Sequence, residues 1–235
     1  MKQTGGRRLV WDLPLRVFHW LLVLSLCASF ASAKAGFDWV EIHMKLGYWM
    51  MGLLLFRIMW GIVGPRHARF LNFIKGPVTI WCYTRGLLKD ESPESVGHNP
   101  LGSLMVILML ALLAAQVGTG LFVTDDIMYS GPYNPAVSSA TADSLTGWHH
   151  RNFNLILAAV GLHVLAVLFY LRAKKQDLIT PMVSGKKAAA VVPEEEAIAS
   201  SQLLKALMVV AVSGALVWLM LDQAPVPVVE DYFFY

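Results

Sequence analysis

Long stretches of hydrophobic residues, separated by short polar segments, dominate the pattern along this chain. Five such stretches lie at residues 17–33, 46–64, 101–124, 152–171 and 206–221. A helix of roughly 17–25 apolar residues crosses the hydrocarbon core of a bilayer, and the short last stretch spans it if Lys205 extends its amine to the interface. The pattern therefore predicts an all-α membrane protein with five transmembrane helices.

Composition supports a membrane protein and excludes two kinds of site. Hydrophobic residues make up 56% of the 235 residues and charged residues only 15%, which is far from the balance of a soluble domain. The two cysteines, Cys27 and Cys82, form no CxxC or CxxCH motif. The sequence therefore contains neither a covalent c-type haem site nor a cysteine-based zinc site.

Lysine and arginine are distributed unevenly between the connections. They gather before the first stretch (Lys2, Arg7, Arg8, Arg16), after the second (Arg66, Arg69, Lys75, Arg85, Lys89) and after the fourth (Arg172, Lys174, Lys175, Lys186, Lys187). The first connection has only Lys34, and residues 125–147 contain three acids and neither Lys nor Arg. Because basic loops stay cytoplasmic, we expect a multi-pass protein with a cytoplasmic N-terminus. In a Gram-negative bacterium this places it in the inner membrane with a periplasmic C-terminus.

The same pattern predicts how the chain is organised. We expect a cytoplasmic N-terminal segment (1–15), a four-helix bundle (16–185), a flexible cytoplasmic linker (186–202), a fifth helix (203–222) and a periplasmic aromatic tail (223–235). A cleavable secretory signal is the alternative for the first stretch, because Arg7-Arg8 precedes an apolar run that ends in Ala31-Ser32-Ala33. Cleavage there would remove His19.

Two histidines, one just before the fourth stretch and one within it, share a helix face. His149 and His163 are fourteen residues apart, which advances a helix by roughly 21 Å and leaves the two rings about 40° from alignment. From His150 the same calculation leaves the rings about 140° apart. We therefore expect His149 and His163 to be ligands at two membrane depths, with His150 a neighbour of the outer site.

Two further histidines lie at matching depths. His19 follows Arg16 near the expected cytoplasmic end of the first helix, and His43 begins the second helix on the periplasmic side. Depth pairs His19 with His163 and His43 with His149. Neutral imidazole is a common axial ligand of iron, so we expect two b-type haems, with these four histidines as the metal ligands. The alternative for each is a hydrogen-bonding or interfacial histidine.

Other residues are expected to border the haems. Arg57, fourteen residues after His43, and Arg16 are candidates to bind propionates near the inner haem, and Arg151 near the outer one. Gly47 lies one turn after His43, where the missing side chain would let a porphyrin approach; Gly118 and Gly120 either do the same or allow close helix packing. His67 and His98 are expected at the surface or interface, with His98 able to approach a quinone or the inner haem.

Several motifs together resemble the prokaryotic cytochrome b561 superfamily, in particular the cytochrome b subunits of membrane-bound nickel–iron hydrogenases. The motifs are Arg16-Val17-Phe18-His19-Trp20, His43 with Gly47, Arg57-Ile58-Met59-Trp60-Gly61, Gly97-His98-Asn99-Pro100, Trp148-His149 and Gly161-Leu162-His163. The resemblance covers residues 10–187; the fifth helix and tail lie outside it. It implies a four-helix bundle with two haem b groups, and its ligand positions fall on His19, His43, His149 and His163.

These observations favour an electron-transfer subunit of a respiratory chain over a stand-alone enzyme. Electrons would pass between quinone and a periplasmic redox partner, either a hydrogenase or a c-type cytochrome attracted by Asp125, Asp126 and Asp143. The fifth helix would dock another membrane subunit or cover this bundle. One alternative is a superoxide:quinone oxidoreductase with Lys45, His150 and Arg151 near an exposed haem edge. A second is a transporter that uses the histidines without haem.

Overall fold

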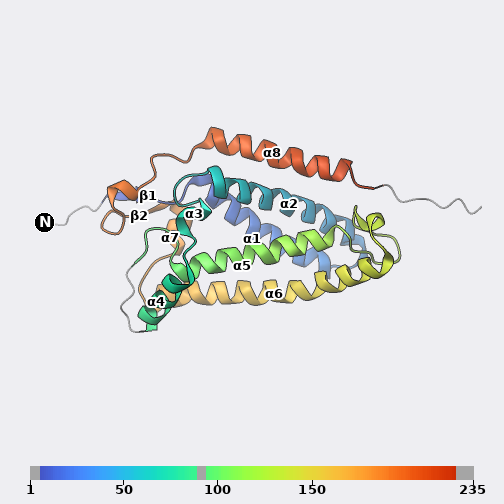
Figure 1. The fold of residues 1–235 in the computed structure, drawn as a ribbon, viewed down its shortest axis with the longest axis horizontal. Coiled ribbons are helices and arrows are strands. Elements are labelled where there is room, and N and C mark those ends of the chain that lie inside the picture. The colour runs from blue at the N-terminus through green and yellow to red at the C-terminus, as the bar shows by residue number, and fades with distance from the viewer. Residues whose placement is uncertain (1–5, 89–93, 226–235) are drawn as a thin grey trace, which may run out of the picture.

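Five long helices run side by side along the molecule (Figure 1). The structure, a computed structural model, describes residues 6–88 and 94–225. The long helices are α1 (Leu13–Lys34), α2 (Val40–Val63), α5 (Pro100–Gly120), α6 (Ser139–Arg172) and α8 (Leu203–Asp222). Each is long and apolar enough to cross a membrane, which confirms the predicted multi-pass, almost entirely helical architecture.

The short elements cap the two ends of these helices. One end holds strands β1 (Arg7–Leu9) and β2 (Lys186–Ala188), helices α3 (Phe70–Phe73), α4 (Pro77–Leu88) and α7 (Ile179–Ser184), and the 3-10 turn Glu194–Glu196 (Figure 1). We call it the basic end, because the described Lys and Arg residues of the three predicted clusters lie in or beside these elements. The opposite end holds the 3-10 turns Phe37–Trp39 and Asn134–Ala136.

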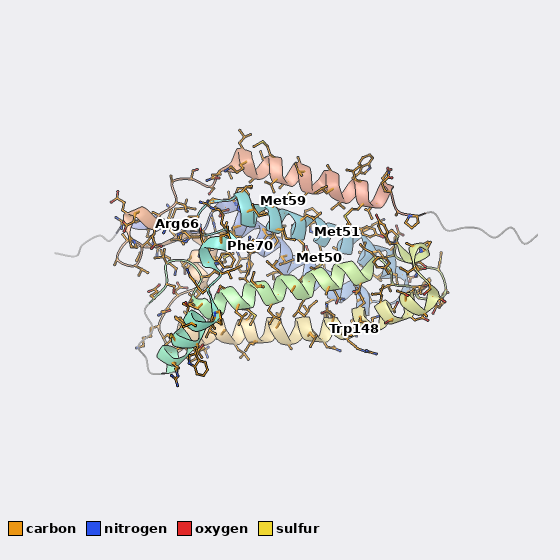
Figure 2. All side chains as sticks on the ribbon, viewed as in Figure 1. Met50, Met51, Met59, Arg66, Phe70 and Trp148 are labelled. Carbon is orange, nitrogen blue, oxygen red and sulfur yellow. The ribbon has the colours of Figure 1, made fainter. Side chains whose placement is uncertain are left out.

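Helix α2 is the centre of the packing. It contacts α1, α5 and α8, and α5 in turn packs along α6. The core beside α2 has two parts, one around the fully buried Trp60 near the basic end and one around Met50, Leu113 and Ile156. Figure 2 shows Met50 and Met51 on α2 midway along the bundle. Most side chains on the outer helix faces are apolar and exposed, as expected of surfaces that contact lipid.

Three helix starts are fixed by side-chain caps. The Asp12 carboxylate accepts from the Leu15 amide (2.9 Å), and the Asn99 side chain accepts from the Gly102 amide (2.6 Å). Proline in the first turn of α1 and of α5 reinforces these starts. Ser138 caps α6, which therefore begins at Ser139, well before His149 and before the apolar stretch that starts at residue 152. Hydropathy marks the part of a helix inside lipid, whereas the cap marks its actual start.

The segment after α6 is folded, which corrects the expectation of a flexible linker. β2 pairs antiparallel with β1, so that Arg7 lies opposite Ala188. The Arg8 guanidinium donates to the Val192 carbonyl (2.6 Å), and the Ile198 amide donates to the Leu9 carbonyl (2.9 Å). We call this paired region the terminal clasp. It joins the N-terminal strand to the segment that leads into α8.

Helix α8 covers the outer side of α2. Near the basic end the Lys205 amine donates to the Val63 carbonyl (3.2 Å), and near the opposite end the Tyr133 hydroxyl donates to the Met220 carbonyl (2.6 Å). Of the two expectations for this helix, covering its own bundle is therefore the observed arrangement. Residues 226–235 of the predicted aromatic tail lie outside the described residues.

The Asp12→Ala substitution tests the cap at the basic end. Asp12 is buried, and its Oδ1 also accepts from the Trp60 indole (2.9 Å). Loss of the cap and of this hydrogen bond should lower the free energy of unfolding by about 2–4 kcal/mol. Equilibrium unfolding of the detergent-solubilised protein measures it, with the exposed Asp38→Ala as control. An equal, small effect of both variants would contradict the structural role of Asp12.

Candidate functional site: two histidine pairs

His43 of α2 and His149 of α6 face each other near the end opposite the basic end. Their ring centres are 6.3 Å apart and the ring planes meet at 84°. Both rings are half-buried between helices. The structure thus brings together the two histidines that matching depth paired.

Backbone carbonyls orient both rings through Nδ1. His43 Nδ1 lies 2.9 Å from the Ser29 carbonyl, and His149 Nδ1 lies 3.0 Å from the Gln116 carbonyl. Because a carbonyl oxygen only accepts, each Nδ1 must carry the proton. The lone pair of each imidazole is then on Nε2, which is the arrangement of a histidine prepared to bind a metal.

Two hydroxyl groups support these bonds, and sequence reasoning missed them. Ser32 Oγ lies 3.4 Å from His43 Nδ1, and Thr119 Oγ1 lies 3.2 Å from His149 Nδ1. The buried serines Ser25, Ser29 and Ser32 recur along one face of α1. Such a polar stripe in an otherwise apolar helix is the sequence signal that would have indicated where α1 meets α2.

Glycines leave space around the pair. A side chain added at Gly47, one turn after His43, would meet no atom within 4 Å, and the same holds at Gly118. Gly120 differs, because an added Cβ would lie 3.1 Å from His149 Cε1. Gly47 is therefore free to accommodate a ligand, whereas Gly120 allows close contact with the His149 ring.

The second pair lies nearer the basic end. His19 of α1 and His163 of α6 are half-buried and close enough for their rings to interact electrostatically. His19 Nδ1 is shielded from solvent and has no hydrogen-bond partner among the described residues. The ring of Trp20 packs edge-on against His19, with centres 5.1 Å apart. The structure therefore leaves both histidines of the second predicted pair half-buried at the same end of the bundle, and their ligation of one iron stays a prediction.

Three residues near the outer pair, His150, Arg151 and Lys45, were candidates to bind an anion. His150 is exposed, as its helical phase predicted. The Arg151 guanidinium lies 5.9 Å from the ring centre of Trp148, which Figure 2 labels on α6. Lys45 forms an ion pair with Glu41, so its charge is balanced locally. Of the three residues considered for binding an anion such as superoxide, His150 and Arg151 are exposed and form no ion pair among the described residues.

The two arginines predicted to border the inner haem have protein partners. Arg57 is buried, donates to the Ala68 carbonyl (3.2 Å) and stacks 4.6 Å from the ring centre of Phe70. Figure 2 shows Phe70 beside the basic end of α2. Arg16 donates to the Val183 carbonyl, and its Nε is buried without a partner among the described residues. Propionate binding by either remains a prediction.

His67 and His98 are not at the surface, which corrects the sequence-based expectation. His67 is buried and lies 2.8 Å from the Glu196 carbonyl through Nε2. His98 packs between Trp11 (4.7 Å between ring centres) and Phe73 (4.4 Å). Burial, together with the charge of Arg57, lowers the pKa of His98 to about 3. Trp11, which lies between β1 and α1, and Phe73 of α3 fold over this position, which charge counting did not reveal.

The predicted acidic patch is smaller than its sequence suggests. Asp125 Oδ1 accepts from the amides of Ile127, Met128 and Tyr129, and these bonds lower the pKa of Asp125. Its carboxylate therefore builds the turn of the loop before α6. Asp126 and Asp143 are exposed and remain available to a partner.

Comparison with known proteins identifies the class that this fold and these histidines define. The family model described as prokaryotic cytochrome b561 matches residues 10–185. The chain belongs to this family, which confirms the predicted resemblance. Membership implies a b-type haem and electron transport in a membrane.

The relatives are named as subunits of one kind of enzyme. The chain is 26% identical over 216 residues to a probable Ni/Fe-hydrogenase B-type cytochrome subunit of Rhizobium leguminosarum bv. viciae, covering 76% of this chain and 87% of the relative. Its counterpart in Azotobacter vinelandii is 25% identical, with 75% and 86% covered. The Cupriavidus necator counterpart is 23% identical, with 75% and 85% covered. No solved structure gives a significant match.

The low pKa of His98 makes stability depend on pH. Folded His98 stays neutral down to about pH 3, whereas the unfolded side chain gains a proton near 6.5. Its contribution to stability is therefore present above pH 6.5 and is lost as the pH falls, by about 1.4 kcal/mol between about pH 7.5 and 5.5. Unfolding free energies measured across this range should fall less steeply in His98→Gln than in the unsubstituted protein. Identical slopes would show that His98 titrates normally in the fold.

Proposed function

We propose that this chain is the di-haem cytochrome b subunit of a membrane-bound hydrogenase. It passes electrons between a redox partner on the periplasmic side and quinone in a bacterial inner membrane. Ligation of one haem by His43 and His149, and of a second by His19 and His163, is the central part of the proposal. The observation that carries it is the facing pair His43 and His149 between two membrane-spanning helices, with His19 and His163 as a second pair of half-buried histidines nearer the basic end.

The geometry of the outer pair supports ligation of one iron. Two imidazoles that bind one metal ion from opposite sides, through metal–nitrogen bonds of about 2.0–2.1 Å, have ring centres roughly 6–6.5 Å apart. The centres of His43 and His149 are 6.3 Å apart. Because both Nδ1 atoms donate to backbone carbonyls, the two Nε2 atoms would bind the iron. Gly47, one turn from His43, leaves room for the porphyrin.

The inner pair is supported by its chemistry. A buried imidazole nitrogen without a partner, such as Nδ1 of His19, is costly in an apolar setting, and ligation of a metal by that nitrogen would relieve the cost. Arg16 and Arg57 provide positive charge at the adjacent basic end. In this proposal they balance the propionates, in addition to the carbonyl bonds that they make.

The protein's own residues determine how electrons move. When bound, haem iron accepts and releases one electron at a time. The carbonyls of Ser29 and Gln116 hold the outer imidazoles in one tautomer and make Nε2 a stronger ligand, which favours the oxidised iron. The apolar core around Met50 and Ile156 keeps water from the region between the two pairs.

The partner and the orientation rest on separate observations. Hydrogenase is proposed because the related chains are named as hydrogenase cytochrome subunits. The concentration of Lys and Arg at the basic end supports its placement in the cytoplasm. Asp126 and Asp143 then face the periplasm, where they are available to contact the partner. Quinone is the proposed acceptor or donor within the membrane.

Replacing one histidine of each pair tests the assignment. His163→Ala should remove one haem and leave the other, and His149→Ala should remove the other one. Each variant should therefore contain about half of the bound haem, since each iron needs both axial ligands. Haem quantitation and reduced-minus-oxidised spectra of the purified variants measure this.

The control is His150→Ala, which removes a neighbouring exposed imidazole and should retain both haems. Loss of the same spectral component from His163→Ala and His149→Ala would contradict the pairing. Absence of any b-type signal from the unsubstituted protein would reject haem binding and favour the transporter alternative.

The open space beside Gly47 provides a second test. Gly47→Val should lower occupancy of the outer haem at least tenfold, because the new side chain fills the space proposed for the porphyrin. The helix itself should tolerate valine, because nothing lies within 4 Å of the added Cβ. Gly214→Val in α8 is the matched control, since Gly214 is equally open and lies away from the histidines. Unchanged haem content in Gly47→Val would remove Gly47 from the site.

A further inference from the structure

Helix α4 carries a stripe of exposed apolar and basic side chains. Val78, Trp81 and Arg85 follow one another at spacings of three and four residues, so they share one helix face, and Ile74 continues the line just before the helix. Val78 is 73% exposed and Trp81 60% exposed. Leu71 in the preceding α3 is 96% exposed. Large apolar side chains gathered in this way mark a surface that contacts something other than water.

The other face of α4 fixes the depth of this stripe. The Tyr83 hydroxyl lies 3.0 Å from the hydroxyl of Tyr170, and the Lys174 amine donates to the Leu87 carbonyl (2.8 Å). Tyr170 lies in the last turn of α6, and Lys174 follows the end of that helix. Because α6 is one of the five spans, α4 is held where a span leaves the hydrocarbon core. Figure 1 shows α4 beside the α6 end at the basic end.

The charged side chains of residues 65–88 are all basic. Residues 65–88 contain four basic residues, Arg66, Arg69, Lys75 and Arg85, and no Asp or Glu. All four basic side chains are exposed, and Figure 2 labels Arg66 at this end. The Arg85 guanidinium lies 5.0 Å from the ring centre of Trp81. Tryptophan is favoured in the headgroup layer of a membrane, and basic side chains at that depth are attracted by anionic headgroups.

We propose that residues 71–85 form a docking surface for anionic phospholipid. Leu71, Ile74, Val78 and Trp81 insert among the upper acyl chains, and Lys75 and Arg85 contact the lipid phosphates. The occupant is lipid because α4 is attached to the end of a membrane-spanning helix and its exposed basic residues complement anionic headgroups. This surface holds the connection between α2 and α5 on the membrane, and it does not depend on haem content.

Fluorescence quenching of Trp81 by brominated lipid tests the proposal. The full-length protein is reconstituted in nanodiscs of mixed phosphatidylglycerol and phosphatidylcholine, with bromine near the glycerol end of only one of the two lipids. The emission of Trp81 is the difference between the protein and its Trp81→Phe variant in the same bilayer. We expect brominated phosphatidylglycerol to quench this difference signal more strongly than brominated phosphatidylcholine does.

The contribution of charge is tested with a matched pair of variants. Lys75→Gln should reduce the preference for phosphatidylglycerol about fivefold, which is the effect of one basic residue at a membrane surface. Lys186→Gln removes an exposed charge of β2 at the same end and should leave the preference unchanged. Equal quenching by the two lipids would overturn the anionic preference.

Two further outcomes would overturn the docking surface itself. Quenching of Trp81 by water-soluble acrylamide but by neither brominated lipid would place the stripe in water. Protection from both kinds of quencher would mean that a protein, either a second copy or another subunit, covers α4. Loss of haem in any variant would bear on the histidine pairs and not on this result.

Discussion

The interior of a membrane offers no water, so each polar group within a spanning helix needs a partner from the protein. That constraint shapes the bundle, because three of its polar side chains bond across helices. His43 joins α2 to the backbone of α1, and His149 joins α6 to that of α5. Asn152 adds a second link by donating to the Leu112 carbonyl and to Gln116 Oε1, both at 2.8 Å. The bonds that hold neighbouring helices together are therefore the same bonds that orient the candidate ligands.

The apolar pattern and the residue spacing predicted only features within a single helix, namely its span in lipid and the face on which a residue lies. Apolar runs record the part of each helix inside lipid, so they located five spans but missed the extension of α6 back to Ser139. The fourteen-residue interval between His149 and His163 fixed their shared face, because a helix has a constant repeat. Partners on other helices depend on packing, so the roles of Ser32 and Thr119 beside the rings were not visible in the sequence.

Polar composition was the least reliable predictor of which segments and side chains are exposed to water. The segment after α6 has the composition of a solvated linker, yet Val192 is fully buried and Ile198 nearly so. At the same end of the molecule, Arg57 and His67 are buried together with aromatic residues, although Arg57 was expected beside a haem and His67 at the surface or interface. A charge count treats every ionisable side chain as exposed. Only the tertiary contacts of Trp11, Trp60 and Phe73 show which of them are not.

The terminal clasp has a consequence for the order in which the molecule is assembled. Arg7 and its partner Ala188 are separated in sequence by four membrane-spanning helices. Chains are made from the N-terminus, so β1 must remain unpaired until α6 has been inserted and β2 has been synthesised. Strand pairing then joins the beginning of the bundle to its end. The clasp can therefore close only after all four of these helices have been synthesised, and α8, which it leads into, is made later still.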